Sequence, residues 1–269
     1  MERAPEPVLE IPPEERILTG EDDLVLLRRR KFFTVSALYN PRYTTNAFLT
    51  DLRRDGDFIH QGSASLLANT VIAERYGVYA KATGYLARYV ENSVLDYTGL
   101  TGELGGQIPI KSYRLALGYR YNHVEDRDFS RTLLNQNELF GSLWRTFGLS
   151  QTSALTPYFT ASRIWASPDV FTNTALRLGA SFVQLINPKW ILSFDAQGFG
   201  LFYNDFFEST LNESRKDYGV RAGASVRWNL HKNVSLDGRL AIAYSDSTID
   251  AFDYFEFSVE PMILFQARF

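Results

Sequence analysis

The sequence contains no cysteine and only three histidines among its 269 residues. The missing thiols exclude a disulfide framework, a thiolate metal site and a cysteine nucleophile. Three scattered histidines leave little for a histidine-rich metal centre. We therefore expect no metal site and no other cofactor.

A long hydrophobic run and an excess of charge of one sign are also missing. No stretch of 18 or more apolar residues occurs, which excludes a transmembrane helix. The 28 Lys and Arg residues nearly balance the 31 Asp and Glu residues, so nucleic acid is not expected as a partner. The first ten residues lack the apolar core of a signal peptide, which indicates a processed chain or a portion of a longer one.

Residues 1–30 differ in composition from the rest of the chain. They combine four prolines with glutamates, and such a segment buries little apolar surface. A basic run at 28–31 then suits either a solvated boundary or contact with anionic lipid headgroups. The expected organisation is a Pro- and Glu-rich tail over 1–30 followed by one domain over 31–269.

The dominant period after residue 31 is two. In 113–122, Tyr and Leu side chains alternate with Arg, Ala, Gly and Asn, and 218–230 repeats this split with Val, Ala and Trp against Arg, Gly and Ser. Helical spacing would spread these apolar residues around all sides of a helix, whereas strand geometry places them on one face. The pattern therefore predicts β-strands. We predict twelve strands, at 32–43, 58–72, 78–91, 99–110, 113–124, 135–147, 156–165, 174–186, 190–203, 218–230, 234–244 and 254–269.

Strand length and connection length together indicate a membrane barrel. The predicted strands mostly run to about eleven to fifteen residues, whereas soluble strands average about five or six and a tilted strand crosses a bilayer in about nine to eleven. Short turns alternate with longer, mostly polar or acidic loops, and the strand number is even. Closure follows because unpaired backbone groups are costly in hydrocarbon. The predicted fold is an all-β, closed, antiparallel up-and-down transmembrane β-barrel.

Aromatic residues gather near the predicted strand ends, as amphipathic rings do at the level of lipid headgroups. They suggest two girdles, although aromatic residues are also good strand formers in general. The short-turn end would carry Phe32, Phe33, Trp190, Trp228 and Phe269, and the loop end Tyr39, Tyr43, Tyr121, Tyr203, Tyr244 and Tyr254.

The last strand places apolar residues on one face and ends in phenylalanine, as shown by Phe255, Phe257, Val259, Ile263, Phe265, Ala267 and Phe269. This pattern resembles the C-terminal signature of bacterial outer-membrane proteins, which the barrel-assembly machinery reads. The resemblance implies an outer-membrane location with both termini in the periplasm, and Phe265 and Phe269 as the assembly signal. It also implies outer-membrane lipid and lipopolysaccharide as surroundings. Ala267 departs mildly from the signature.

Two prolines and two strands do not fit a regular ladder. Pro261 lacks an N–H donor, so we predict a bulge or a ladder gap there, and Pro157 should lie near the periplasmic rim. In 78–91, Lys81 and Arg88 fall on opposite faces, and 135–147 also places charges on both faces. A bulge or an extension beyond the membrane would resolve each case.

If the apolar faces meet lipid, charged side chains of both signs line the lumen. The predicted lining residues are Arg114, Arg120, Arg177, Arg221, Arg227, Arg239, Glu103, Asp195, Asp237, Glu256 and Glu260, with Arg268, Gln107 and Gln197 beside them. One reading is that these charges cancel and fill the barrel. The other is a narrow, slightly basic channel that favours small hydrophilic solutes, anionic or sugar-like, through charge-assisted hydrogen bonds.

Two other functions remain open. The barrel could belong to a secretion or envelope-assembly complex and use residues 1–30 to bind a periplasmic partner. It could also be an outer-membrane hydrolase, because a histidine clusters with acids and a serine at His123, Glu125, Asp126, Asp128 and Ser130. No motif such as G-x-S-x-G supports the hydrolase, so we expect no enzyme. Acidic loops could bind divalent cations that bridge lipopolysaccharide, or carry solvated charge only.

Overall fold

The computed structural model describes residues 32–47, 49, 55–72, 76–206 and 214–269. The predicted tail at 1–30 lies outside these residues. Within the described part, no helix is long and apolar enough to cross a bilayer. The chain forms twelve long strands and a two-residue extension, with bounds β1 (Phe33–Thr44), β2 (Asp57–Ile72), β3 (Tyr76–Tyr89), β4 (Tyr97–Ile110), β5 (Tyr113–Asp126), β6 (Thr132–Trp144), β7 (Phe147–Gly148), β8 (Ser153–Ser167), β9 (Asn173–Asn187), β10 (Trp190–Phe206), β11 (Ser214–His231), β12 (Val234–Ser247) and β13 (Tyr254–Arg268).

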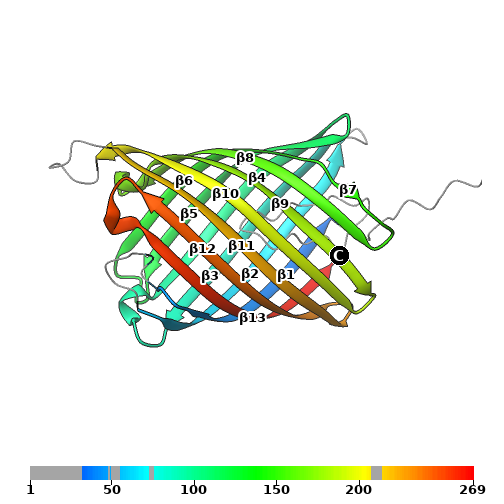
Figure 1. The fold of residues 1–269 in the computed structure, drawn as a ribbon, viewed down its shortest axis with the longest axis horizontal. Helices are drawn as coiled ribbons and strands as arrows, with labels where there is room; N and C mark the ends of the chain where they lie inside the picture. The colour runs from blue at the N-terminus through cyan, green and yellow to red at the C-terminus, as the bar shows by residue number, and fades with distance from the viewer. Residues whose placement is uncertain (1–31, 48, 50–54, 73–75, 207–213) are drawn as a thin grey trace, which may run out of the picture.

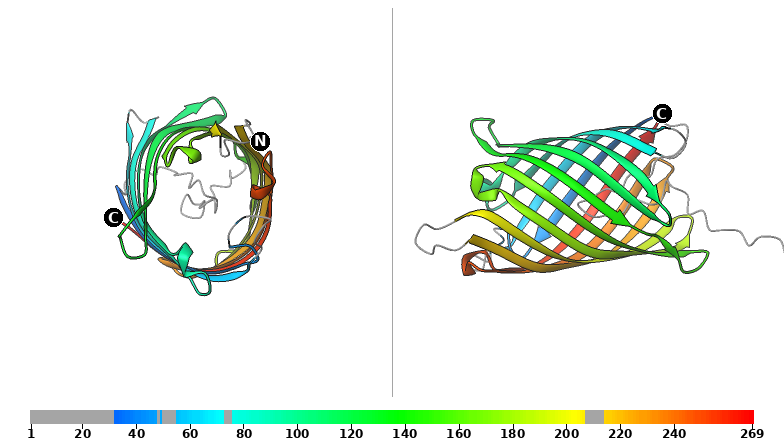
Figure 2. Two further views of the ribbon diagram at one scale, coloured as in Figure 1. Left: turned by 90° about the vertical axis from the view of Figure 1, so that its left-hand side faces the viewer. Right: turned by 90° about the horizontal axis from the view of Figure 1, so that it is seen from above.

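The strands form one closed antiparallel barrel, which Figure 1 shows from the side and Figure 2 along its length. Each long strand pairs with the long strands before and after it in the chain, so β6 pairs with β8, and β1 pairs with β13 to close the barrel. The short strand β7 pairs with β8 alone. At the closing seam the backbone N–H of Phe33 donates to the Phe269 carbonyl at 3.3 Å, and the N–H of Phe269 donates back at 2.9 Å. The two ends of the barrel domain therefore meet at the short-turn end, and the predicted fold class is confirmed.

Three short 3₁₀ helices lie at the loop end of the barrel. They are η1 (Ser93–Leu95), η2 (Asp169–Phe171) and η3 (Asp250–Phe252). Side chains at the rim hold the loop of η1, because Asp57 accepts hydrogen bonds from the backbone N–H groups of Val90 and Asn92 at 3.1 and 2.9 Å. The loop of η1 is thus tied to the start of β2.

The barrel's two faces follow the alternation in the sequence. Large apolar side chains on the outer face are exposed in the isolated chain, with Leu104 at 60% and Leu178 at 66%. Polar and charged side chains on the inner face are buried, and Glu256 and Asp237 are two examples. This is the reverse of a soluble sandwich, where apolar faces meet in a dry core. An apolar exterior of this kind is stable in contact with acyl chains.

Aromatic residues collect on the outer face near both ends. The indole rings of Trp190 and Trp228 stack at the short-turn end with centroids 5.4 Å apart, and Tyr39, Tyr43 and Tyr244 are exposed toward the loop end. Tyr203 was predicted in the same girdle but lies on the inner face, where Arg215 packs on its ring at 4.5 Å. Phe202, the preceding residue of β10, faces outward. Because successive residues of a strand point to opposite faces, Tyr203 faces inward.

The observed strands overlap all twelve predicted ones, with boundaries that differ by a few residues. β11 begins at Ser214, four residues before the predicted start, and β6 ends at Trp144, three before the predicted end. The ladder between β6 and β8 stops at Tyr158, next to Pro157, and resumes between β7 and β8. Pro157 therefore lies toward the short-turn end, where its missing N–H interrupts pairing only locally.

Irregular charges are accommodated without a bulge in β3 or in the middle of β6. Lys81 faces inward, while Arg88 faces outward near the loop end and donates to the Tyr97 carbonyl at 2.6 Å and to Thr98 Oγ1 at 3.0 Å. On β6, Glu138 faces inward and is buried, and Leu139 faces outward. Extension of the strands toward the rim, one of the two explanations considered, accounts for Arg88.

Candidate pore lining

One part of the inner face is built from ion pairs, which we call the ion-pair wall. Its members come from β1 and from β10 to β13. In its most regular pair, Arg227 on β11 faces its register partner Asp237 on β12 and donates through Nε and Nη2 at 2.9 and 2.7 Å. Both side chains are nearly buried, so the pair is shielded from solvent. The wall comprises Arg42, Asp195, Arg227, Asp237, Arg239, Glu256 and Glu260.

The curvature of the barrel brings residues two strands apart into contact. Arg239 on β12 reaches over β11 and donates from Nη2 to Asp195 on β10 at 3.0 Å, and its Nη1 lies 3.8 Å from Glu260 on β13. The pair passes directly over Gly223 on β11. A Cβ at Gly223 would lie 2.8 Å from Arg239 Nη2 and 3.1 Å from Asp195 Oδ1. The missing side chain at Gly223 therefore makes room for this bridge.

The ion-pair wall extends across the closing seam through Arg42. Its guanidinium forms an ion pair with Glu256 on β13, and Thr44 Oγ1 donates to the same carboxylate at 2.8 Å. Arg42 Nε also lies 3.7 Å from Glu260. The sequence analysis missed Arg42, although it shares the inward parity of Asn40 on β1, a signal that the period of two already contained.

A smaller ion triad occupies the opposite part of the inner face. Arg120 on β5 lies between Glu103 on β4 and Glu138 on β6, with N–O distances of 2.9 and 3.0 Å. Its guanidinium carbon also lies 5.2 Å from the ring centroid of Phe140. Arg120 and Glu103 were predicted to line the lumen, whereas Glu138 was not among the predicted residues. The triad carries one more negative than positive charge.

Aromatic rings cover glycines along the rest of the inner face, in what we call the ring-on-glycine wall. Tyr158 on β8 illustrates it: its ring lies over Gly179 on β9, where a Cβ would approach Tyr158 Oη to 2.6 Å. The hydroxyl donates to Gln197 on β10 at 3.2 Å, so the side chain reaches across β9. The ring-and-glycine pairs are Tyr79 with Gly105, Tyr85 with Gly99, Phe140 with Gly118 and Tyr158 with Gly179, and Phe199 with Gly219 borders the ion-pair wall.

These rings lie along the wall because a glycine beneath each one leaves space for it. The hydroxyl groups find polar partners on nearby strands: Tyr79 donates to Glu103 at 2.6 Å, and Tyr85 donates to Asn122 at 2.5 Å. Such contacts keep large side chains against the barrel rather than across its interior. The inner surface is therefore both aromatic and hydrogen-bonding.

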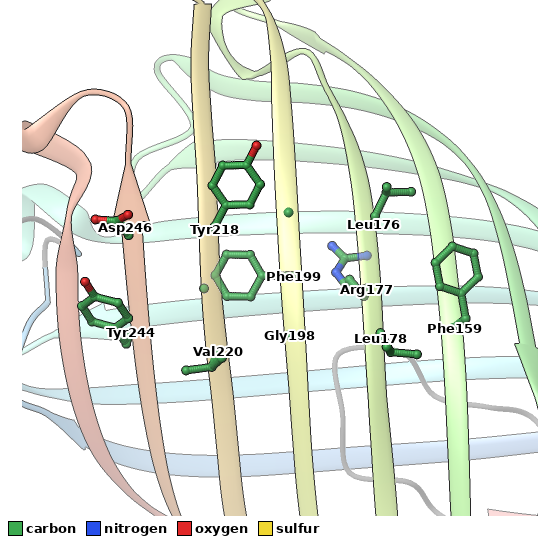
Figure 3. A pocket seen from close by; sticks show the side chains of 12 residues that line it. Phe159, Leu176, Arg177, Leu178, Gly198, Phe199, Tyr218, Val220, Tyr244 and Asp246 are labelled. Carbon is green, nitrogen blue, oxygen red and sulfur yellow. The ribbon is translucent and has the colours of Figure 1, made fainter.

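Arg177 on β9 differs from the arginines of the ion-pair wall and of the ion triad. No acidic side chain within the described residues lies at ion-pair distance from it. Its register partners are Thr160 on β8 and Phe199 on β10, and Figure 3 shows it beside β10 and Phe199. Its guanidinium is half-buried rather than enclosed. Arg177 therefore retains donors that a solute could use.

The structure brings some predicted lining residues together and leaves others apart. Arg227 joins Asp237, and Arg239 joins both Asp195 and Glu260. Glu256 joins Arg42 instead. Arg221 faces inward between Gln197 and Ala243, Arg114 lies near the short-turn end opposite Pro109, and Arg268 donates to Gln266 at 2.9 Å.

An ion pair at the loop end was not predicted. Arg215 on β11 donates to both carboxylate oxygens of Asp217, with Nη2 at 2.6 Å from Oδ2. Its guanidinium carbon lies 3.6 Å from the ring centroid of Phe252 in η3. Ser247 Oγ donates to Asp217 at 2.6 Å and completes the contact between β11 and the η3 loop. These contacts hold that loop at the mouth of the barrel.

The candidate hydrolase residues fall into two separate groups. His123 faces outward, with Nδ1 2.5 Å from Asn135 Oδ1 and Nε2 3.3 Å from Glu125. Ser130 instead donates from Oγ to Asp126 Oδ2 at 2.6 Å, and this bond lowers the pKa of Asp126 at the exposed rim. A serine nucleophile needs the histidine, not only an acid, at its hydroxyl. The geometry offers no assembled triad.

A groove of about 590 Å³ lies between β8 and β12, and Figure 3 shows the side chains that line it. Most of its lining faces outward: Leu176 and Leu178 form one side, Tyr218 and Val220 the other, and Gly198 and Gly200 the floor. Because this surface belongs to the apolar exterior, the groove faces lipid and is not a solute site. Within the described residues, no group of three or more His, Asp or Glu side chains is arranged to hold a metal ion.

Comparison with solved structures gives the same fold. An outer membrane channel from Pseudomonas putida F1 aligns with a TM-score of 0.53 at 14% identity, over 89% of this chain and 97% of that one. The NanC porin aligns at 0.51 with 8% identity, over 86% and 98%, and a bacterial polysaccharide outer membrane secretin at 0.51 with 9% identity, over 89% and 99%. Neither a family model nor a curated protein matches the sequence. The chain thus has the fold of outer-membrane β-barrels.

Proposed function

We propose that this chain is an outer-membrane diffusion channel for small hydrophilic solutes, with a preference for anionic or sugar-like ones. The observation that carries the proposal is Arg177, an inward guanidinium without an acidic partner among the described residues. Most other inward arginines with defined contacts are neutralised, so Arg177 supplies the positive potential that attracts an anion. Arg221 faces the same interior two strands away.

The neighbouring surface suits a sugar as well as a simple anion. The Phe199 ring lies beside Arg177, and Gln197 and the Tyr158 hydroxyl are bonded to each other nearby. A sugar ring offers hydroxyl groups to such donors and acceptors and an apolar face to an aromatic ring. Two of the similar solved structures are a porin and an outer membrane channel, which accords with this proposal.

The proposal includes an orientation and a set of partners. The short turns would face the periplasm, and so would the first and last residues of the barrel domain, as in outer-membrane barrels generally. Phe265 lies on the outer face of β13, and Phe269 follows the strand and is exposed; both would present the assembly signal to the barrel-assembly machinery. Outer-membrane lipid and lipopolysaccharide would surround the apolar exterior, and residues 1–30 would be free to bind a periplasmic partner.

The test is the ion selectivity of the purified chain in a planar bilayer. Under a salt gradient, the reversal potential should show anion preference, and Arg177→Gln should lower the anion-to-cation permeability ratio by about twofold because it removes an uncompensated charge. The matched control is the double variant Arg227→Gln/Asp237→Asn. It removes one charge of each sign from a closed pair and should leave the ratio unchanged.

The secretion or envelope-assembly component is the second candidate. One similar solved structure is a polysaccharide secretin, and its barrel aligns as well as the porin does. The bilayer recording separates the two functions. A silent chain that conducts only after a partner is added, with loss of that partner on deletion of residues 1–30, would replace the channel proposal with this one. Hydrolysis of lipid or peptide abolished by His123→Ala would replace both.

A further inference from the structure

The seam between β1 and β13 differs from the other interfaces between long strands. Neighbouring strands elsewhere are successive in the chain, whereas β1 and β13 are the first and last strands. Six rows pair from Thr34 with Arg268 to Tyr39 with Ile263, and two more pair at Tyr43 with Val259 and Thr44 with Ser258. Three rows between these two stretches lack ladder pairing, so the seam is interrupted on the loop side of its middle.

Two facing prolines cause the interruption. The register is the same on both sides of the gap, since Tyr43 is four residues after Tyr39 on β1 and Ile263 is four residues after Val259 on β13. Pro41 therefore lies opposite Pro261, and neither strand has the extra residue of a bulge. Phe33 with Phe269 and Thr45 with Phe257 are hydrogen-bonded rows, and such rows recur at every second residue. Pro41 and Pro261 therefore occupy a row in which each residue should donate to the other. Neither proline has an N–H, so both bonds of that row are missing.

Side chains close the inner side of this gap. Arg42 pairs with Glu256 across the seam and lies 3.7 Å from Glu260, which also faces Arg239. Even so, Arg42 Nε and Asn40 Oδ1 are buried without hydrogen-bond partners in the closed seam. Buried polar atoms without partners favour any state that hydrates them. The closed arrangement is therefore held by few bonds and leaves polar groups unsatisfied.

The outer side of the gap offers little steric resistance. Pro41 and Pro261 face the lipid. On the other side of Pro261, its register partner on β12 is Gly238. No side chain would contact a Cβ built at Gly238 within 4 Å. From Tyr39 to Tyr43 the strand covers about 13 Å, a length that accommodates part of an extended acyl chain.

We propose that the β1–β13 seam is a lateral portal, through which the acyl chain of an amphiphilic molecule passes between the barrel interior and the surrounding lipid. The portal lies at Pro41 and Pro261, and the Arg42, Glu256 and Glu260 side chains close it from within. Charged groups at its inner edge would contact the polar part of the amphiphile, while its acyl chain lies in the gap between the two strands. This property is independent of passage of water-soluble solutes along the barrel axis.

The test measures whether lipid chains reach the interior at the seam. The chain has no native cysteine, so a fluorophore can be attached at a single introduced one. Met262→Cys places it on the inner face at the gap, and Thr83→Cys places it on the inner face of β3, whose ladder with β2 is complete over fourteen rows. Both variants are reconstituted in phosphatidylcholine vesicles with or without bromine on the acyl chains, which quenches on contact.

Quenching by brominated chains should be at least about twofold greater at residue 262 than at residue 83, because only the seam admits lipid. Pro41→Ala/Pro261→Ala restores both N–H donors and should lower quenching at 262 to the level at 83. Pro41→Ala alone restores one donor and should give an intermediate value. Equal quenching at the two sites would overturn the proposal, and so would quenching at residue 262 that does not change with the proline substitutions. Conductance of small ions in the same variants reports on the axial channel separately.

Discussion

The ion-pair wall and the ring-on-glycine wall complete the same inner surface by different physical means. At Arg239 and Asp195 the bridge over β11 depends on charge, and at Tyr158 the bridge over β9 depends on an aromatic ring and its hydroxyl. In both, the strand beneath contributes a glycine, Gly223 or Gly179. A concave face crowds side chains together, so each reach across a strand needs an empty position below it.

The two walls differ in the free-energy cost of removing one of their side-chain groups. Removing one partner of a buried ion pair leaves an uncompensated charge, whose cost exceeds the value of the pair itself. Removing a ring hydroxyl costs one hydrogen bond. Adding a methyl group beneath either bridge has an effect that depends on what must move. Substitutions in the two walls measure this contrast.

The largest expected effect is at Arg227. Arg227→Ala should lower the free energy of unfolding by about 3–5 kcal/mol, because Asp237 would remain buried without its bidentate partner. Urea unfolding in lipid vesicles, followed by tryptophan fluorescence, measures it. Arg227→Ala/Asp237→Ala should recover most of this loss. If the double variant were as unstable as the single one, the cost would come from lost packing and not from charge.

Gly179→Ala should come next, with a loss of about 1–3 kcal/mol from overpacking. A Cβ there would lie 2.7 Å from the backbone carbonyl oxygen of Ala196 as well as 2.6 Å from the Tyr158 ring, and the backbone cannot move aside. Gly102→Ala is the matched control, since a Cβ at Gly102 meets nothing within 4 Å. Equal stability of the two variants in the same unfolding assay would show that β9 shifts freely.

Much of the fold follows from the sequence because period two is a local property. It predicted the twelve strands, and it placed Arg227 and Asp237 on one face near a short turn, where register brings them together. Closure followed from the cost of unpaired backbone groups in hydrocarbon. The missing N–H of Pro261 predicted a bulge or a ladder gap, of which the structure shows the gap. The Arg239–Asp195 bridge depends instead on the curvature of three strands and on Gly223. No local pattern carries that information.

Some residues were missed for a different reason. Arg42, Glu138 and Asp217 all have inward parity, yet each lies near a strand end or in a strand with charges on both faces. Uncertain boundaries made parity hard to assign there. The free state of Arg177 could not be predicted at all, because it depends on the positions of every neighbouring acid.

Gly223→Ala should be milder than Gly179→Ala, at about 1 kcal/mol, because the nearest atoms belong to the end of the flexible Arg239 side chain. The guanidinium can move away, but only by giving up Asp195. Asp195→Asn should therefore destabilise the Gly223→Ala chain less than the parent, because the bond between Arg239 and Asp195 is already lost in that chain. A double-mutant cycle in the unfolding assay measures this coupling. Strict additivity would mean that the bridge survives the added methyl group.

The smallest expected effect is at the Tyr158 hydroxyl. Tyr158→Phe keeps the ring over Gly179 and removes the hydroxyl that donates to Gln197, so the free energy of unfolding should fall by about 0.5 kcal/mol, the low end for one hydrogen bond at a half-buried site. Tyr158→Ala, by contrast, would expose Gly179 and remove the ring packing. If Tyr158→Phe were as damaging as Tyr158→Ala, the hydroxyl rather than the ring would hold this wall together, and both walls would depend on polar contacts.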